Sequence, residues 1–261
     1  MPDDELHVIF LDIGQGDAIL IQRGSQQVLI DGGGSPQMLT GELGDRMPFW
    51  DRTIELVVLT HPHEDHLGGL VEVLERYRVE QVLYPDLEYD SPLYEEWEEL
   101  IEAEGIASMS AQAGQEIDLG EGVTMTVLHP PATLMDGTGS DINNNSAVLR
   151  LDTGRVSFLF TGDIEREAEF RLIAGGGELD CTVLKVGHSG SLTSTSVEFL
   201  AAASPQLAVI SVGDNPYGHP HNEVVTRLET SLGEENVFRT DDDGTIEFIT
   251  DGEGLWVVIG E

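Results

Sequence analysis

The most informative segment of the chain is VVLTHPHEDHLGGL, residues 57–70, which places three histidines, a glutamate and an aspartate between an apolar run and a glycine pair. The preceding run IELVVL, residues 54–59, has the composition of a buried strand. The following segment LGGLVEVLERY, residues 67–77, spaces its apolar residues like a helix. The polar cluster is therefore predicted to lie in the turn from a strand into a helix.

Four of these polar side chains have the chemistry and spacing of metal ligands. His61 and His63, two apart in an extended turn, point the same way and can bind one ion, while Asp65 and His66 can face a second. Imidazole combined with carboxylate suits zinc, manganese or iron, whereas calcium and magnesium prefer more oxygen ligands. We therefore predict a metal site at this turn, with Glu64 as a spacer.

Length and composition point to a globular protein. The chain has 261 residues, of which 40% are hydrophobic, and it contains one cysteine. A single cysteine excludes an intrachain disulfide and a thiolate-rich metal site. No run of about 18 apolar residues occurs, and the acidic start MPDDEL does not resemble an export signal.

The charge of the chain is strongly negative. Forty-nine acidic residues against 12 basic ones give a formal net charge of −37. Such a surface repels phosphate backbones unless bound metals, high salt or a partner protein offsets it. Lys185 is the only lysine, and strand alternation predicts that its stem is buried and its amine exposed, outside the catalytic set.

Strands and helices alternate along the chain, which predicts a layered α/β fold. We expect a single domain, residues 1–261, built from two similar halves at about 1–128 and 145–261. The segment between them, residues 129–144, is rich in Pro, Gly, Asp and Asn and is predicted to be a loop.

The pattern H-x-H-x-D-H followed by Gly-Gly resembles the signature of the metallo-β-lactamase superfamily, and the resemblance extends over nearly the whole chain. LIDGG, residues 29–33, is similar to the family motif whose aspartate, here Asp31, supports the metal loop. FLFTGD, residues 158–163, is similar to the strand that ends in the aspartate bridging two metals, here Asp163. The resemblance implies a four-layer αββα sandwich in which a metal-bridging hydroxide is the nucleophile.

Further motifs resemble one branch, the metallo-β-lactamase-like domain of the DNA-uptake competence protein ComEC. They lie at residues 10–22 (FLDIGQGDAILIQ), 143–151 (NNNSAVLRL), 161–165 (TGDIE), 184–196 (LKVGHSGSLTSTS) and 210–221 (ISVGDNPYGHPH). The resemblance implies metal-dependent phosphodiester cleavage, with nuclease activity on DNA and a membrane channel as a possible partner.

The resemblance also implies how two divalent ions, zinc or manganese, are held. The ligands of the first site are His61, His63 and Asp163, and those of the second are Asp65, His66, Asp163 and His188. Asp65 and Asp163 are the expected catalytic carboxylates. Asp31 is expected to orient the metal ligands without binding a metal itself. Asp17 could do the same, but its position in a glycine turn favours hydrogen bonding to the backbone amides of that turn.

Two departures from related patterns concern the remaining polar residues. Asn145 and Ser146 stand where the lactamase and glyoxalase branches have a third histidine, which argues against those branches. Ser189 stands where the ComEC pattern has a second histidine after His188. His129 could replace the missing ligand, although a loop role is favoured. The candidate substrate contacts are Asn145, Ser189, Ser191, His219 and His221.

Three functions remain open at this point. The first is a DNA phosphodiesterase or nuclease, and the second is a hydrolase of small esters, lactones or phosphodiesters. The third is a binding or regulatory module without catalysis. A complete chain is expected in the cytoplasm, and a fragment of a longer ComEC-type protein is expected at the membrane.

Overall fold

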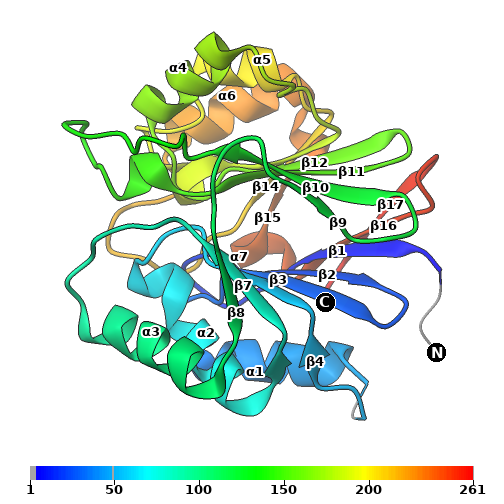
Figure 1. The fold of residues 1–261 in the computed structure, drawn as a ribbon. Helices are drawn as coiled ribbons and strands as arrows, with labels where there is room; N and C mark the ends of the chain where they lie inside the picture. Colours follow the sequence, from blue (N-terminus) through cyan, green and yellow to red (C-terminus); the bar gives the residue numbers. More distant parts are fainter. Residues whose placement is uncertain (1–3, 49, 261) are drawn as a thin grey trace.

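The computed structural model describes residues 4–48 and 50–260. Two mixed sheets pack face to face, with helices covering the outer side of each (Figure 1). This arrangement confirms the predicted four-layer αββα sandwich. Within the described residues, no helix combines the length and apolarity needed to cross a membrane.

The first sheet has eight strands in the order β17-β16-β1-β2-β3-β5-β7-β8. Pairing is antiparallel from β17 to β3 and parallel from β3 to β8. The strands are β1 (Leu6–Phe10), β2 (Ile19–Arg23), β3 (Gln26–Ile30), β5 (Leu56–Val58), β7 (Gln81–Tyr84), β8 (Ala107–Ser110), β16 (Ile246–Thr250) and β17 (Leu255–Ile259). Two short strands, β4 (Thr53–Ile54) and β6 (Arg78–Val79), form a separate pair.

The second sheet has seven strands in the order β15-β14-β13-β12-β11-β10-β9. Pairing is parallel from β15 to β12 and antiparallel from β12 to β9. The strands are β9 (Glu116–Asp118), β10 (Val123–His129), β11 (Val148–Thr153), β12 (Val156–Phe160), β13 (Val183–Lys185), β14 (Leu207–Ile210) and β15 (Val237–Arg239).

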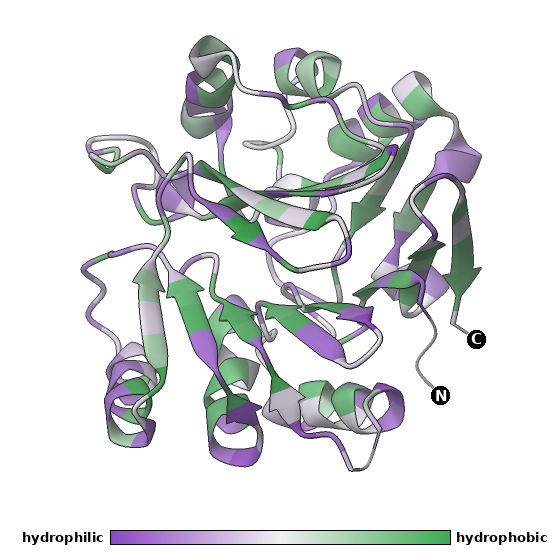
Figure 2. Ribbon diagram, turned by 45° about the vertical axis from the view of Figure 1, so that its right-hand side comes forward, coloured by the Kyte–Doolittle hydropathy of each residue, from purple (hydrophilic) through white to green (hydrophobic). Residues whose placement is uncertain are grey.

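The helices close the outer faces of the sheets. One set, α1 (Pro36–Arg46), α2 (Glu64–Arg76) and α3 (Pro92–Glu104), packs its apolar residues on the first sheet. The other set, α4 (Arg166–Gly175), α5 (Val197–Ala203) and α6 (Asn222–Leu232), does the same on the second sheet, and α7 (Thr240–Asp243) lies before β16. A third apolar cluster fills the space between the sheets, and Figure 2 shows hydrophobic residues concentrated on the strands.

Strand pairing crosses the boundary between the two halves expected from the sequence. β9 and β10 precede the loop at 129–144 but pair into the second sheet through β11. The C-terminal hairpin of β16 and β17 returns to the first sheet through β1. Each sequence half therefore contributes a hairpin to the sheet of the other half, because the antiparallel edges can complete either layer.

The parallel parts of the sheets determine where the polar motifs gather. β3 and β5 are parallel neighbours in the first sheet, and β12 and β13 are parallel neighbours in the second. Neighbouring parallel strands end at the same edge of a sheet, where the following loops can build a site. The motifs containing Asp31, His61, Asp163 and His188 follow these four strands.

Candidate metal centre

The metal loop follows β5 and leads directly into α2. His63 is the N-cap residue of α2, with extended backbone, and Glu64 and Asp65 occupy its first turn. Carboxylates in this position interact favourably with the positive end of the helix dipole. The strand-to-helix transition predicted from the sequence therefore carries the polar cluster, and the helix start fixes the backbone on which Asp65 and His66 stand.

The glycine pair lets α2 approach the neighbouring turn. A Cβ at Gly69 would lie 2.1 Å from the carbonyl oxygen of Gly32, and one at Gly68 would lie 3.1 Å from that of Gly33. Without side chains, the Gly32 N–H donates to the His66 carbonyl at 2.7 Å. The Gly-Gly sequence thus seats His66 against the turn that contains Asp31.

Asp31 orients His66 and the start of the metal loop. Its Oδ1 accepts a hydrogen bond from the Thr60 N–H at 2.7 Å, and its Oδ2 accepts one from the Thr60 hydroxyl at 2.7 Å. The same Oδ2 lies 2.8 Å from His66 Nδ1. A carboxylate that holds one ring nitrogen of a histidine leaves the other nitrogen available to a metal. Asp31 itself has a left-handed backbone, with φ of 57°, imposed by these contacts.

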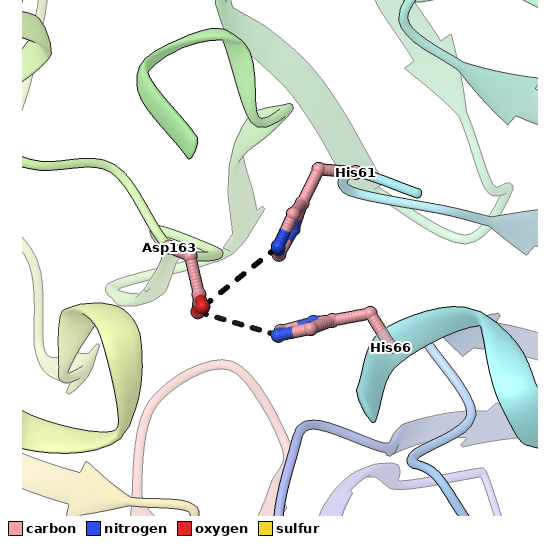
Figure 3. Close-up of side chains that lie close together, drawn as sticks. All are labelled: His61, His66 and Asp163. Carbon is pink, nitrogen blue, oxygen red and sulfur yellow. Dashed lines mark ion pairs between the residues drawn. The ribbon is translucent and has the colours of Figure 1, made fainter. Parts of the chain in front are cut away.

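Asp163 faces the histidines from the opposite sheet (Figure 3). Its Oδ1 lies 3.4 Å from His66 Nε2, and its Oδ2 lies 3.8 Å from His61 Nε2 and 3.6 Å from His188 Nε2. One carboxylate oxygen therefore faces His66 and the other faces His61, two of the three histidines of the metal loop. This is the geometry expected of a carboxylate that bridges two ions.

The donor atoms at this point fit a divalent metal. Ligand atoms of His61, His66 and Asp163 all lie within 4.8 Å of one another, and the three side chains are buried. His66 Nε2 and Asp163 Oδ1 are buried without a hydrogen-bond partner. Unpaired buried polar atoms are costly, so their convergence, together with nitrogen and carboxylate donors, matches the requirements of a transition metal or zinc.

The pKa shifts describe the charge of the metal-free cluster. Burial lowers the pKa of His61 well below its ordinary value, so this imidazole is neutral. Burial also opposes protonation of His66, but the Asp163 and Asp31 carboxylates outweigh it and raise the pKa of His66 well above its usual range. Burial would raise the pKa of Asp163, yet His66, His188 and His61 hold it well below its ordinary value. The cluster is therefore built around an ionised Asp163.

The other predicted ligands surround this group. His63 is half-buried, and its Nδ1 lies 3.0 Å from His61 Nε2. Asp65 accepts a hydrogen bond from Gln15 Nε2 at 3.4 Å. Both residues line a cleft of about 330 Å³ over the site, together with Gln15, Glu64, Asn143, Asp163, His188, Tyr217 and His219. The structure thus brings all six predicted metal ligands to one place.

His188 reaches the site through a strained turn. His188 and Ser189 both have left-handed backbones, with φ of 52° and 49°. Two consecutive residues other than glycine in this region are unfavourable and persist only where surrounding contacts impose them. Glu165 Oε1 lies 3.6 Å from His188 Nδ1, on the side of the ring away from Asp163. Glu165, which the sequence did not single out, therefore places a negative charge beside His188, at a longer distance than Asp31 has from His66.

Three of the five predicted substrate contacts are used elsewhere. Asn145 bonds with its side chain to the backbone of Met135 and Asp141, and so holds the loop at 129–144. Ser191 bonds to Thr193, and the His221 ring accepts from the Glu223 N–H at the start of α6. These contacts give Asn145, Ser191 and His221 partners within the chain, and their contact with substrate stays a prediction.

The remaining candidates lie at or beside the cleft. His219 lines it, and its ring centroid lies 5.3 Å from that of His188. Ser189 is buried and accepts a hydrogen bond from Gln15 Nε2 at 3.1 Å. Asn143, Gln15 and Tyr217 also line the cleft and were not predicted, because their motif positions alone do not distinguish them from neighbouring loop residues.

Lys185 and His129 take structural positions. Lys185 is fully buried and ion-paired with Asp17, which corrects the prediction of an exposed amine. The paired carboxylate of Asp17 lies 3.9 Å from His66 Nδ1, so Asp17 stands behind the ligands. His129 is buried at the end of β10, and its Nε2 donates to the Asn144 carbonyl at 2.8 Å. His129 therefore hydrogen-bonds to the backbone from the end of a strand, where the sequence favoured a loop residue.

Known proteins resemble the chain over most of its length. It is 32% identical to ComE operon protein 3 of Bacillus subtilis, over 94% of this chain and 33% of that protein. It is 31% identical to competence protein ComA of Neisseria gonorrhoeae, over 95% of this chain and 33% of that protein. The chain thus spans about one third of the length of these relatives.

Solved structures share the fold at low sequence identity. The metallo-beta-lactamase fold protein YhfI of Bacillus subtilis superposes with a TM-score of 0.60 at 14% identity, covering 97% of this chain and all of that one. A diphosphatase of the PhnP family superposes with a TM-score of 0.53 at 14% identity, covering 93% of this chain and 98% of that one.

The family model of the metallo-beta-lactamase superfamily matches residues 11–214. This range contains the histidine motif, Asp163 and His188. Proteins of this fold typically bind divalent metals, and the buried histidine and aspartate group described above provides the ligands for one. The chain belongs to the metallo-β-lactamase superfamily of metal-dependent hydrolases.

Proposed function

We propose that this chain is a dinuclear metal-dependent phosphodiesterase that cleaves DNA. The observation that carries the proposal is the convergence of His61, His66 and Asp163 ligand atoms within 4.8 Å, with His63, Asp65 and His188 around them. His61, His63 and Asp163 would hold one divalent ion, and Asp65, His66, Asp163 and His188 the other. Bound ions would supply an activated water and neutralise charge on the phosphoryl oxygens.

The protein groups have separate tasks in this reaction. Asp163 places one carboxylate oxygen toward His66 and the other toward His61, and would thereby set the spacing of the two binding positions. Asp31 holds the His66 ring at 2.8 Å, and Glu165 places a carboxylate 3.6 Å from Nδ1 of His188. His219, at the cleft wall with its Nδ1 unpaired, is positioned to donate a proton to the leaving oxygen. Burial and His188 lower the pKa of His219, so the cationic ring that donates this proton is populated mainly below pH 6.5.

The names of the relatives support DNA as the substrate. ComE operon protein 3 and competence protein ComA match nearly the whole chain. We propose that the chain acts as the nuclease domain of a longer, membrane-associated DNA-uptake protein, beside a channel. The ions would be zinc or manganese, because the donors are imidazole and carboxylate.

The negative charge of the chain opposes binding of the DNA backbone. Among the described residues that line the cleft there is no lysine or arginine, whereas Glu64, Asp65 and Asp163 are acidic. Phosphate must therefore be attracted by the bound ions. Gln15, Asn143 and His219 offer neutral hydrogen-bonding groups, and the exposed Tyr217 offers a ring face for a base.

The lack of cleft cations also supports a second candidate, a hydrolase of small phosphodiesters. A small diester carries one negative charge, and its binding does not require a basic surface along a nucleic-acid backbone. The net charge of −37 favours this reading at low salt. High salt weakens the distinction, since the Debye length falls to about 3 Å at 1 M.

One experiment separates these functions. Metal content is measured on purified protein, and single-stranded DNA, bis(p-nitrophenyl) phosphate and a lactone are then tested with manganese or zinc across a salt series. Metal-dependent DNA cleavage supports the proposal. Turnover of the small diester without DNA cleavage at any salt concentration supports the second candidate. Metal binding without turnover of any substrate, or no metal binding at all, leaves a binding module.

A further inference from the structure

A buried ion pair lies behind the metal centre and joins the two halves of the site. Lys185, the only lysine in the chain, is 0% exposed and pairs with Asp17, which is 2% exposed. Lys185 ends β13 in the second sheet, and Asp17 follows β1 in the first. A fully buried ammonium is costly unless it is paired and hydrogen-bonded, so the position calls for an explanation.

On one side, Lys185 holds the turn that carries Asp163. Its Nζ donates to the Gly162 carbonyl at 3.3 Å, directly before Asp163. The Thr161 hydroxyl donates to the Lys185 carbonyl at 2.8 Å, so the same turn is fixed from two directions. The ammonium of Lys185 thus contacts the backbone directly before Asp163.

On the other side, Asp17 belongs to a turn that packs under the metal loop. A Cβ at Gly16, the residue before it, would lie 1.7 Å from the Asp65 carbonyl oxygen. The Asp17 carbonyl accepts a hydrogen bond from the Gly33 N–H at 2.8 Å. The turn around Asp17 therefore touches the backbone of Asp65 and the segment next to Asp31.

Lys185 also affects how the Asp17 carboxylate interacts with His66. Ligand atoms of Asp17, Asp31 and His66 lie within 4.8 Å of one another, and Asp17 Oδ2 is 3.9 Å from the His66 Nδ1 atom that Asp31 holds at 2.8 Å. Without a partner, the Asp17 carboxylate would compete with Asp31 for this nitrogen. Lys185 supplies the partner from the opposite side.

We propose that Lys185 is a positioning residue for the metal centre, acting as an internal cation that binds Asp17 and the Gly162 carbonyl and thereby fixes His66 and Asp163 across the sheet interface. The inference rests on the proposed metal-binding function. It does not depend on the substrate.

The test is a double-mutant cycle of Lys185→Met, Asp17→Asn and the combined variant. Unfolding by denaturant is measured in EDTA, the affinity for Mn²⁺ by titration calorimetry, and the ligand field by the visible absorption of the Co²⁺-loaded protein. Each single variant leaves one buried charge or donor unpaired and is expected to unfold more easily, while the combined variant regains stability. Asp17→Asn is nearly isosteric and provides a folded variant if Lys185→Met does not fold.

The affinity for Mn²⁺ shows whether Lys185 positions the metal ligands or only stabilises the fold. We expect the combined variant to bind Mn²⁺ about 10- to 100-fold more weakly than the wild type, and to show a changed Co²⁺ spectrum, although its stability has returned. Wild-type Mn²⁺ affinity and an unchanged spectrum in the combined variant would overturn the inference. Arg150→Met, which breaks the ion pair with Asp152 on β11, is the matched control and should bind Mn²⁺ like the wild type.

The outcomes for the inference and for the proposed function differ. A wild type that binds Mn²⁺ but cleaves no phosphodiester overturns the proposed function, and the affinity comparison still decides the role of Lys185. A wild type that cleaves phosphodiesters, with a combined variant of equal Mn²⁺ affinity, overturns only the inference. A wild type that binds no divalent ion overturns both.

Discussion

The Nε2 atom of His66 lies 3.4 Å from the Oδ1 atom of Asp163, although His66 belongs to a helix on the first sheet and Asp163 follows a strand of the second. The metal centre is therefore a property of the interface between the sheets. Neither sheet carries the complete ligand set, so the packing of the apolar layer between them controls the spacing of the ligands.

Replacing Asp163 with asparagine should abolish the bridging position. The variant keeps the shape of the side chain but loses the charge that faces three histidines. We expect the metal content to fall by at least one ion and phosphodiesterase activity to fall by at least about 100-fold, as measured by elemental analysis and steady-state kinetics. Asp152→Asn on β11 serves as control. Full activity of the Asp163 variant would contradict the bridging role.

Tyr217 should contribute to binding of single-stranded DNA. Its side chain is 70% exposed at the cleft wall, and its ring centroid lies 5.8 Å from that of His219. Stacking on a base contributes about 1–3 kcal/mol, so Tyr217→Ala should raise KM for an oligonucleotide about 10-fold with little change in kcat. Tyr217→Phe keeps the ring and should keep KM. Trp256→Ala removes an exposed aromatic side chain on β17, outside the cleft, and should leave KM for the oligonucleotide unchanged.

Asn143 and Asn145 should behave differently although they lie two residues apart. Asn145 bonds to the backbone of Met135 and Asp141, and Asn145→Ala should lower the free energy of unfolding by about 1–3 kcal/mol. Asn143 lines the cleft with an unpaired Oδ1, and Asn143→Ala should lower activity more than stability. Denaturant unfolding and kinetics on both variants check this. A loss of activity in Asn145→Ala and a loss of stability in Asn143→Ala would contradict the assignment of Asn143 to the cleft.

His129 should make the fold sensitive to acid. Burial lowers the pKa of His129 to about 4, from an ordinary value of 6.5. Between these values the unfolded chain takes up a proton that the folded chain does not, so stability falls as the pH decreases from about 6.5 to 4. In His129→Gln this loss should be smaller by up to about 3 kcal/mol. Denaturant unfolding at pH 7, 5.5 and 4 measures it. His221→Gln is the control, and equal losses in the wild type and the His129 variant would refute the assignment.

The parts of the site that follow from local spacing could be predicted from the sequence. His61, His63, Asp65 and His66 lie within one strand-to-helix turn, and their placement needs little beyond that turn. Asp163 and His188 could be predicted through the resemblance to family motifs. The positions that no local pattern distinguishes, such as Asn143 among three successive asparagines, required the structure.

Long-range pairing accounts for the errors. Strand alternation predicted an exposed amine for Lys185. A local sequence pattern does not reveal that the chain places Asp17, from a turn of the other sheet, next to this amine. Long-range pairing also crosses the boundary between the two expected halves, since β10 and β16 pair with strands from the opposite half. Helix α1 was not predicted, because two glycines interrupt its sequence and Leu39 and Leu43 are its only buried residues.

The return of the C-terminal hairpin has a consequence for synthesis of the chain. β1 is synthesised long before β16, although β16 is one of its two neighbours in the sheet. Until β16 has emerged, one edge of β1 carries unpaired backbone groups that invite pairing with other chains. This edge of β1 therefore has to be protected while the segment between β1 and β16 is synthesised, and truncation shortly before Ile246 should give aggregates and not a smaller folded domain.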